Sequence, residues 1–132
     1  MLYLLSPAKS LDYDTPVPAS VREAATTPKF MAQSVELIAL LKTKTPAEVA
    51  ALMDLSEPLA ALNVARYRAW AKRFTTKNSR PAVLAFNGDV YDGLDAKTLG
   101  LDDLAWAQEH VAILSGLHGV LRPLDRLQPL PW

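Results

Sequence analysis

Short runs of apolar residues alternate along this chain with longer segments in which apolar and polar positions are mixed. Three runs stand out at 1–5 (MLYLL), 83–86 (VLAF) and 111–114 (VAIL), and each is followed by a polar or glycine-containing turn. Continuous apolar runs of this length that end in turn residues are typical of strands buried in a sheet. The pattern therefore predicts three short buried strands.

Between the first two runs, the start signals and the spacing of apolar residues predict three helices. Thr27 is expected to cap the first helix, with Pro28 at its first position, where the missing N–H costs nothing. Thr45 and Glu48 have the spacing of a capping box for the second helix. Ser56 is expected to cap the third helix.

The apolar positions of these helices recur every three or four residues, as in a face that packs against a core. The third helix is expected to end near Phe74, and SLDYDTPVPAS at 10–20 is expected to be a loop because of its prolines. A further short helix is predicted at 101–110, with Asp102 and Asp103 near the positive end of its dipole. The positions expected to be buried are Phe30, Val35, Leu37, Ile38, Leu41, Val49, Leu52, Met53, Leu59, Leu62, Tyr67, Trp70 and Phe74.

The predicted order of elements is strand, three helices, strand, helix, strand. Strands separated by helices are typical of α/β proteins, because parallel neighbours need long crossover connections. We therefore expect an α/β fold with a short parallel or mixed sheet and several helices. The 132 residues are enough for one compact domain, and no internal repeat divides them.

The composition excludes several classes of protein. Half of the residues are hydrophobic, 21% are charged and the formal net charge is zero, as in an ordinary globular domain. Because there is no cysteine, disulfides, thiolate metal sites and a cysteine nucleophile are excluded. No apolar run approaches the roughly 20 residues of a membrane helix, and MLYLLSPAKS lacks the basic start of a signal peptide. We expect a cytoplasmic protein with no membrane partner.

Polar residues follow each predicted strand. If the three strands are parallel neighbours, their carboxyl ends share one edge of the sheet, which is where open α/β sheets bind ligands. One hypothesis is therefore an enzyme or small-ligand binder in which Asp89 is a general base and Lys9 and Arg122 bind an anion. The residues of this candidate rim are Ser6, Lys9, Asp89, Tyr91, Ser115, His118 and Arg122.

The same residues have a structural interpretation. The glycines beside them would supply turns, His118 would be a core histidine, and Arg122 would pair with Asp125 or Asp89. The sequence has no GxxxxGK[ST] loop, no GxGxxG fingerprint and no GxSxG elbow. The spacing of its two histidines, His110 and His118, is a poor metal signal. We expect no metal and no cofactor, and the sequence leaves enzyme activity undecided.

A basic segment lies between Pro58 and Gly88, where no acidic residue occurs. Its side chains could contact the phosphates of a nucleic acid; the alternative is a solvated helix face. Trp70 could stack on a base, but its spacing from its aromatic neighbours favours the core. The candidate phosphate contacts are Arg66, Arg68, Lys72, Arg73, Lys77 and Arg80.

The helices predicted on either side of 54–57 have the order of a helix-hairpin-helix element. Such hairpins bind phosphate through exposed backbone N–H groups. The connection here has no glycine, and Asp54 and Glu57 would repel a phosphate. On its own, the hairpin is therefore weak evidence of nucleic-acid binding.

Three stretches, MLYLLSPAKSLDYD, LAFNGDVYDGL and LSGLHGVLRPLDRLQP, resemble in sequence and order the YaaA family of peroxide-stress-response proteins. The resemblance implies a cytoplasmic bacterial protein that limits oxidative damage, in part by keeping free iron low under hydrogen peroxide. It also implies binding to duplex or structured DNA through a positively charged cleft and a helix-hairpin-helix element, and it implies no established enzyme activity. The residues that carry over are Ser6, Lys9, Asp12, Gly88, Asp89, Tyr91, Ser115, Gly116, Gly119, Arg122, Pro123 and Asp125.

Two positions and the length depart from what the resemblance implies. His118 stands where the family often has tyrosine, and Asn87 stands where it often has lysine. Family members are about twice as long, so residues 1–132 are expected to form a single incomplete version of the family domain that lacks the C-terminal half. A truncation or a frameshift near Trp132 would leave an inactive fragment, whose exposed apolar surface would favour self-association.

Overall fold

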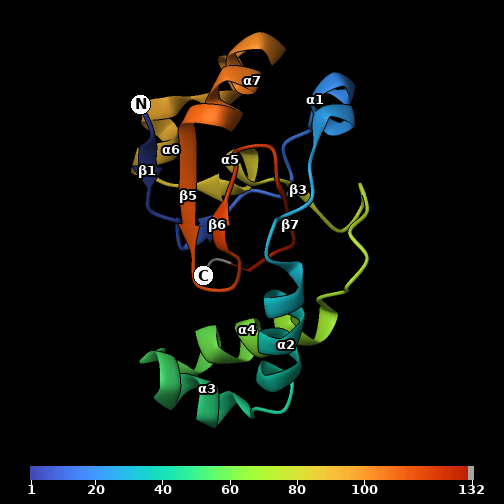
Figure 1. Cartoon of the computed structure of the whole chain (residues 1–132). Coiled ribbons are helices and arrows are strands. Elements are labelled where there is room, and N and C mark those ends of the chain that lie inside the picture. The colour runs from blue at the N-terminus through green and yellow to red at the C-terminus, as the bar shows by residue number, and fades with distance from the viewer. Residues whose placement is uncertain (131–132) are drawn as a thin grey trace.

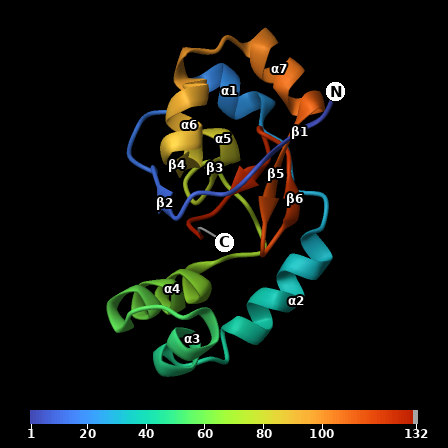
Figure 2. The ribbon, with the colours of Figure 1, turned by 90° about the vertical axis from the view of Figure 1, so that its left-hand side faces the viewer.

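The computed structural model describes residues 1–130. Figure 1 shows a helical part made of residues 31–69 beside an α/β part that holds the described strands. The chain begins in the α/β part, leaves it to form the helical part, and returns for the remaining residues. Figure 2, turned by 90°, shows the same separation of the two parts.

The helices and strands are short and are distributed over the described residues. The segment 10–20, expected to be a loop, contributes a two-residue strand and the start of a helix. The helices are α1 (Ala19–Ala24), α2 (Met31–Leu41), α3 (Pro46–Met53), α4 (Glu57–Ala69), α5 (Ala82–Ala85), α6 (Asp89–Leu94) and α7 (Leu101–His110), with a 3-10 turn η1 at Ala96–Thr98. The strands are β1 (Tyr3–Leu5), β2 (Ser10–Leu11), β3 (Arg80–Pro81), β4 (Phe86–Asn87), β5 (Val111–Ser115), β6 (Gly119–Leu121) and β7 (Arg126–Leu127).

A three-stranded sheet with the order β1-β5-β6 forms the centre of the α/β part. β1 and β5 are parallel, with Leu5 opposite Ile113. β5 and β6 form an antiparallel hairpin, with Leu114 opposite Val120. Two short antiparallel pairs, β2–β4 and β3–β7, lie outside this sheet. The prediction of an α/β fold with a short mixed sheet is therefore confirmed.

The second predicted strand is wrong over most of its length. Ala82–Ala85 forms helix α5, and only Phe86–Asn87 forms a strand, which pairs with β2 rather than with the central sheet. The backbone N–H of Ala82 donates to the carbonyl of Asp125 (2.8 Å), so a tertiary contact fixes the start of this turn. A short apolar run does not distinguish a strand from a buried turn of helix. The predicted strands are thus not three parallel neighbours.

Of the three predicted helix starts, the one at Thr45 is confirmed, the one at Ser56 lacks the expected side-chain bond, and the one at Thr27 is wrong. The Thr45 hydroxyl accepts from the Glu48 N–H (3.2 Å), and the Glu48 carboxylate accepts from the Thr45 N–H (3.1 Å), which confirms the capping box. Ser56 is the N-cap of α4 but forms no side-chain cap bond. The prediction at Thr27 is wrong, because α2 begins at Met31 and the Thr27 carbonyl instead accepts from a distant arginine.

The core is divided into three apolar clusters. The helical part is held together by buried side chains of α2, α3 and α4, including Ile38, Val49, Tyr67 and Trp70. The other two clusters lie in the α/β part, one against the central sheet and one between α1, α5 and α7. Tyr67 and Trp70 are thus confirmed as core residues, although α4 ends at Ala69 rather than near residue 74.

Several residues predicted to be buried are exposed. The first apolar run is the clearest case, since Met1, Leu2, Tyr3 and Leu4 are all exposed although β1 forms. Among the described strands β1 pairs with β5 alone, and little of the described chain packs on its side chains. Phe30, just before α2, is also exposed, as are Leu37, Leu52 and Leu62 of the helical part. Among the described helices, none is both long enough and apolar enough to cross a bilayer.

Candidate functional site

The first two loops of the predicted rim lie on neighbouring segments. Strand β2 follows Ser6 and Lys9, and strand β4 precedes Asp89 and Tyr91. The two strands are paired. The Tyr91 hydroxyl donates to the carbonyl oxygen of Ser6 (2.6 Å), and burial raises the pKa of that hydroxyl. Four rim residues therefore belong to this region: Ser6, Lys9, Asp89 and Tyr91.

His118 lies in the core rather than at an open rim. Its side chain is 1% exposed; its Nδ1 is 3.0 Å from the Ser34 hydroxyl, and its backbone N–H donates to the Ser115 hydroxyl (3.1 Å). The rings of Trp70 and Phe74 flank it at centroid distances of 6.5 and 6.2 Å. Burial lowers the pKa of His118 to about 4, so the ring is neutral at pH 7. The structural interpretation of this histidine fits these contacts.

Arg122 forms an ion pair with Asp125 instead of facing an open site. Its guanidinium donates to both carboxylate oxygens, the shortest distance being 2.8 Å, and to the Thr27 carbonyl (3.0 Å). Asp125 is fully buried and also accepts from the Thr26 hydroxyl (2.6 Å). The rim residues therefore occupy three different environments. A ligand-binding role for them stays a prediction.

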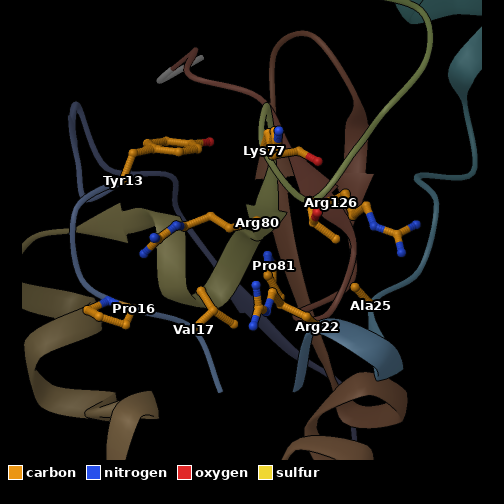
Figure 3. A pocket seen from close by; sticks show the side chains of 11 residues that line it. Tyr13, Pro16, Val17, Arg22, Ala25, Lys77, Arg80, Pro81 and Arg126 are labelled. Atoms are coloured by element: carbon orange, nitrogen blue, oxygen red, sulfur yellow. The ribbon is translucent and has the colours of Figure 1, made fainter. Parts of the chain in front are cut away.

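A different set of charged residues surrounds a cavity of about 210 Å³, shown in Figure 3. Two of its basic residues, Lys77 and Arg80, belong to the predicted phosphate contacts. Two others, Arg22 and Arg126, do not, because they lie in α1 and β7, far from the basic segment in sequence. The pairing of β3 with β7 places Arg80 and Arg126 on adjacent strands. Local charge counting along the sequence could not reveal this convergence.

A second cavity of about 450 Å³ adds Arg66 to this set. Tyr13 and Lys77 line both cavities, so the two cavities adjoin. We call the five residues around them the basic surface: Arg22, Arg66, Lys77, Arg80 and Arg126.

Acidic side chains are scarce around the basic surface, where Asp12 lies near Arg80. No aspartate or glutamate of the described chain lines either cavity. Within residues 1–130, the ion pair found is between Arg122 and Asp125, outside this surface. The Arg80 guanidinium donates to the Thr15 carbonyl (2.6 Å), and its positive charge helps to lower the pKa of the nearby Asp12 carboxyl. Such a surface attracts anions.

Tyr13 lies where the two cavities of the basic surface adjoin. Its hydroxyl donates to the Leu127 carbonyl (2.6 Å), and the Arg80 guanidinium lies 5.4 Å from the centre of its ring. Burial raises the pKa of Tyr13, while the positive charges of Arg80 and Arg66 oppose that rise. Both cations are therefore near the tyrosine. In Figure 3 the side chains of Arg80 and Arg126 point to opposite sides, so the charges are spread out rather than focused on one point.

The remaining predicted phosphate contacts, Arg68, Lys72 and Arg73, are exposed and line neither cavity. Trp70 is buried and packs edge-to-face on Phe74, with ring centroids 5.5 Å apart, so it is not available to stack on a base. This agrees with its core spacing in the sequence.

Helices α3 and α4 pack against each other as a hairpin. The connection turns at Asp54, which has a positive φ of 53°, and Glu57 is the first residue of α4. Both acids remain exposed beside the backbone N–H groups at the start of α4. Phosphate binding by this hairpin stays a prediction. In the described chain, no three His, Asp or Glu side chains gather in a way that would hold a metal ion.

Comparison with known proteins identifies the family. The family model described as peroxide stress protein YaaA matches residues 1–130. The chain belongs to this family. The resemblance seen in the three sequence motifs is therefore confirmed.

Curated relatives named UPF0246 protein are similar to this YaaA-family chain over nearly its whole length. Those of Leptothrix cholodnii and a Polaromonas species are each 66% identical over 129 residues, covering 98% of this chain and 49% of the relative. That of Paracidovorax citrulli is 63% identical with the same coverage. The chain spans about half the length of the curated relatives it matches.

The YaaA-family motifs have identifiable structural roles in this chain. In the first motif, hydrogen bonds from Thr15 lower the pKa of Asp12 to about 2 and close a turn. In the second, a Cβ on Gly88 would lie 3.3 Å from the Ala8 side chain, so the glycine permits close contact with the first motif. In the third, Gly119 has a positive φ of 71° in the β5–β6 hairpin. These residues hold the α/β part together.

Proposed function

We propose that this chain supplies a DNA-binding surface of a cytoplasmic YaaA-family peroxide stress protein, and that the basic surface contacts the phosphates. The supporting observation is the set of five basic side chains around two adjoining cavities that no described carboxylate lines. A duplex presents a regular array of phosphates, and spaced cations match such an array. A compact anion would need donors directed at one point.

The basic surface fits a nucleic-acid backbone better than a specific base reader. Two aromatic residues line its cavities: Tyr13 forms a hydrogen bond with the Leu127 carbonyl and contacts Arg80, and Trp70 is buried. Phosphate contacts position a protein on DNA, whereas base contacts determine sequence preference. We therefore expect binding with little sequence preference. The link to free iron stays a prediction, because no feature described above bears on it.

Fluorescence anisotropy with labelled duplex DNA over a range of salt concentrations tests the proposal. Each phosphate contact that is lost should reduce the slope of log K against log salt by about one. The Arg22→Ala/Arg126→Ala double variant should reduce the slope by about two, with the loss of affinity greatest at low salt. These two positions are informative because the basic segment of the sequence does not include them.

The matched comparison is the Arg68→Ala/Arg73→Ala double variant, which removes the same charge from the exposed side of the basic segment. We expect a smaller change in its salt slope. If this variant loses binding and the Arg22/Arg126 variant keeps it, the helix face rather than the basic surface contacts DNA. Salt-insensitive binding by the unmodified chain, or none, would overturn the proposal of phosphate contacts.

A further inference from the structure

The central sheet has one face packed against the core and one face that is largely open, although Ala112, opposite Leu4 on the latter, is buried. Side chains alternate between the faces of a sheet, so Ile113 and Leu121 point to the core, where both are fully buried. Leu4, Leu114 and Val120 lie on the opposite face and are 62%, 44% and 40% exposed. We call these three residues the outer sheet face. Figure 1 looks onto it, with β5 and β6 in front and α5 behind them.

Figure 2 gives the same arrangement from the side. Helices α5 and α6 lie on one side of the central sheet, α7 ends near the start of β1, and no described helix covers the middle of the other side. A sheet in an α/β protein is normally covered on both faces. The outer sheet face is therefore an apolar surface that no helix of residues 1–130 covers.

The outer sheet face adjoins an unpaired strand edge. β1 pairs with β5 on one side, and among the described strands none pairs with its other side. Met1 and Leu2, just before β1, are 90% and 62% exposed. An apolar edge strand of this kind readily pairs with another chain unless it is covered.

The β5–β6 hairpin connects this face with a second apolar surface. Leu114 and Val120 are opposite each other in the hairpin. Gly116 and Leu117, at its tip, line a cavity of about 280 Å³ whose remaining walls are mainly leucines of α2 and α3. A second apolar surface therefore lies at the tip of the hairpin that carries Leu114 and Val120. Isolated exposed leucines are normal, but a connected apolar area indicates an interaction surface.

The length of the relatives indicates what covers this surface. The chain matches 49% of the Leptothrix cholodnii relative, so that protein contains about as much polypeptide again. We propose that the outer sheet face and the β1 edge bind the half of the family polypeptide that this chain does not match, either within one chain or as a separate one. The contact extends the central sheet beyond β1 and buries Leu4, Leu114 and Val120.

Co-expression tests this proposal. The unmatched half of the Leptothrix cholodnii relative is produced as a separate polypeptide together with this chain, which carries an affinity tag. Purified material is analysed by size-exclusion chromatography with light scattering. We expect a soluble 1:1 complex, and the amide hydrogens of β1 should exchange more slowly in it than in this chain alone.

The Leu114→Lys/Val120→Lys double variant should weaken the complex at least tenfold, because two charges would be placed inside an apolar contact. The matched control is Leu101→Lys/Val90→Lys, which alters the same residue types at positions that are each 44% exposed, on α7 and α6. Circular dichroism should show unchanged helix content in both variants, since all four side chains are exposed. The control should retain the complex.

Three outcomes would overturn the proposal. One is failure of the unmodified chain to bring the other half into a soluble complex. Another is a complex that the Leu114/Val120 variant forms as tightly as the unmodified chain. The third is a homodimer of this chain that persists when the other half is present and is lost in the same variant, which would assign the surface to self-association.

Discussion

The side-chain amide of Gln128 forms both of its hydrogen bonds with the backbone of one residue, Ala71. The Ala71 N–H donates to Oε1 (2.9 Å), and the Gln128 Nε2 donates to the Ala71 carbonyl. Gln128 is 2% exposed and follows β7, whereas Ala71 follows α4. These two hydrogen bonds resemble those between paired residues of a β-sheet. They connect the end of the helical part to the α/β part.

Replacement of Gln128 by alanine should destabilise the chain by about 1–3 kcal/mol, because both hydrogen bonds are lost at a buried position. Urea denaturation followed by circular dichroism would measure the change. The control is Gln33→Ala, at an exposed position of α2, which should change the free energy of unfolding by less than about 0.5 kcal/mol. Equal effects of the two substitutions would show that the Gln128 bonds contribute little.

Asp125 should be more sensitive than Gln128. Its buried carboxylate accepts from the Thr26 hydroxyl, from the Arg122 backbone N–H and from the Arg122 guanidinium. Removing one member of a buried ion pair typically costs about 3–5 kcal/mol, so Asp125→Ala should lower the free energy of unfolding by that amount. Thermal denaturation of Asp14→Ala, an exposed aspartate, provides the comparison and should show almost no shift. A small effect of Asp125→Ala would mean that Arg122 finds another partner.

His118 should make the stability of the chain depend on pH in the acid range. The unfolded chain takes up a proton near the ordinary histidine pKa of 6.5, but burial keeps the folded pKa near 4. Above pH 6.5 both states are neutral at this residue, so it has no effect. As pH falls from 6.5 to 4, the unfolded state binds more protons and stability decreases, by about 3 kcal/mol in total at 1.36 kcal/mol for each pKa unit.

Urea denaturation at several pH values between 7 and 4 would test this dependence. The His118→Gln variant should have a flatter profile, even if it is less stable overall. The His110→Gln variant removes the other histidine and should keep the slope of the unmodified chain. If His110→Gln flattens the profile and His118→Gln does not, His118 is not the residue that is protonated on unfolding.

The N-cap residues of the two hairpin helices differ in their hydrogen bonds and offer an internal comparison. Thr45 accepts a hydrogen bond from the Glu48 backbone, whereas Ser56 occupies the same position of α4 without a side-chain cap bond. Thr45→Ala should therefore cost about 1 kcal/mol, and Ser56→Ala should cost less. Both values come from chemical denaturation. A larger loss at Ser56 would show that its hydroxyl caps α4 in solution.

Local features of this protein could be predicted from the chain alone. The capping box at Thr45, the α7 helix, the β1 and β5 strands and the core positions of Tyr67 and Trp70 depend on neighbouring residues, whose spacing is visible in the chain. The three motifs were also sufficient to indicate the family. In contrast, the run at 83–86 was too short for its periodicity to distinguish a strand from a helical turn.

Where the charged side chains lie depends on how the chain folds and could not be derived from the sequence. The sequence left Arg122 either at an open rim or paired with Asp125 or Asp89, and the turn after β6 pairs it with Asp125. Arg22 and Arg126 join Lys77 and Arg80 because β3 pairs with β7 and α1 packs on β3. The exposure of β1 was likewise not visible in its apolar composition, because burial depends on what packs against a strand and not on the strand alone.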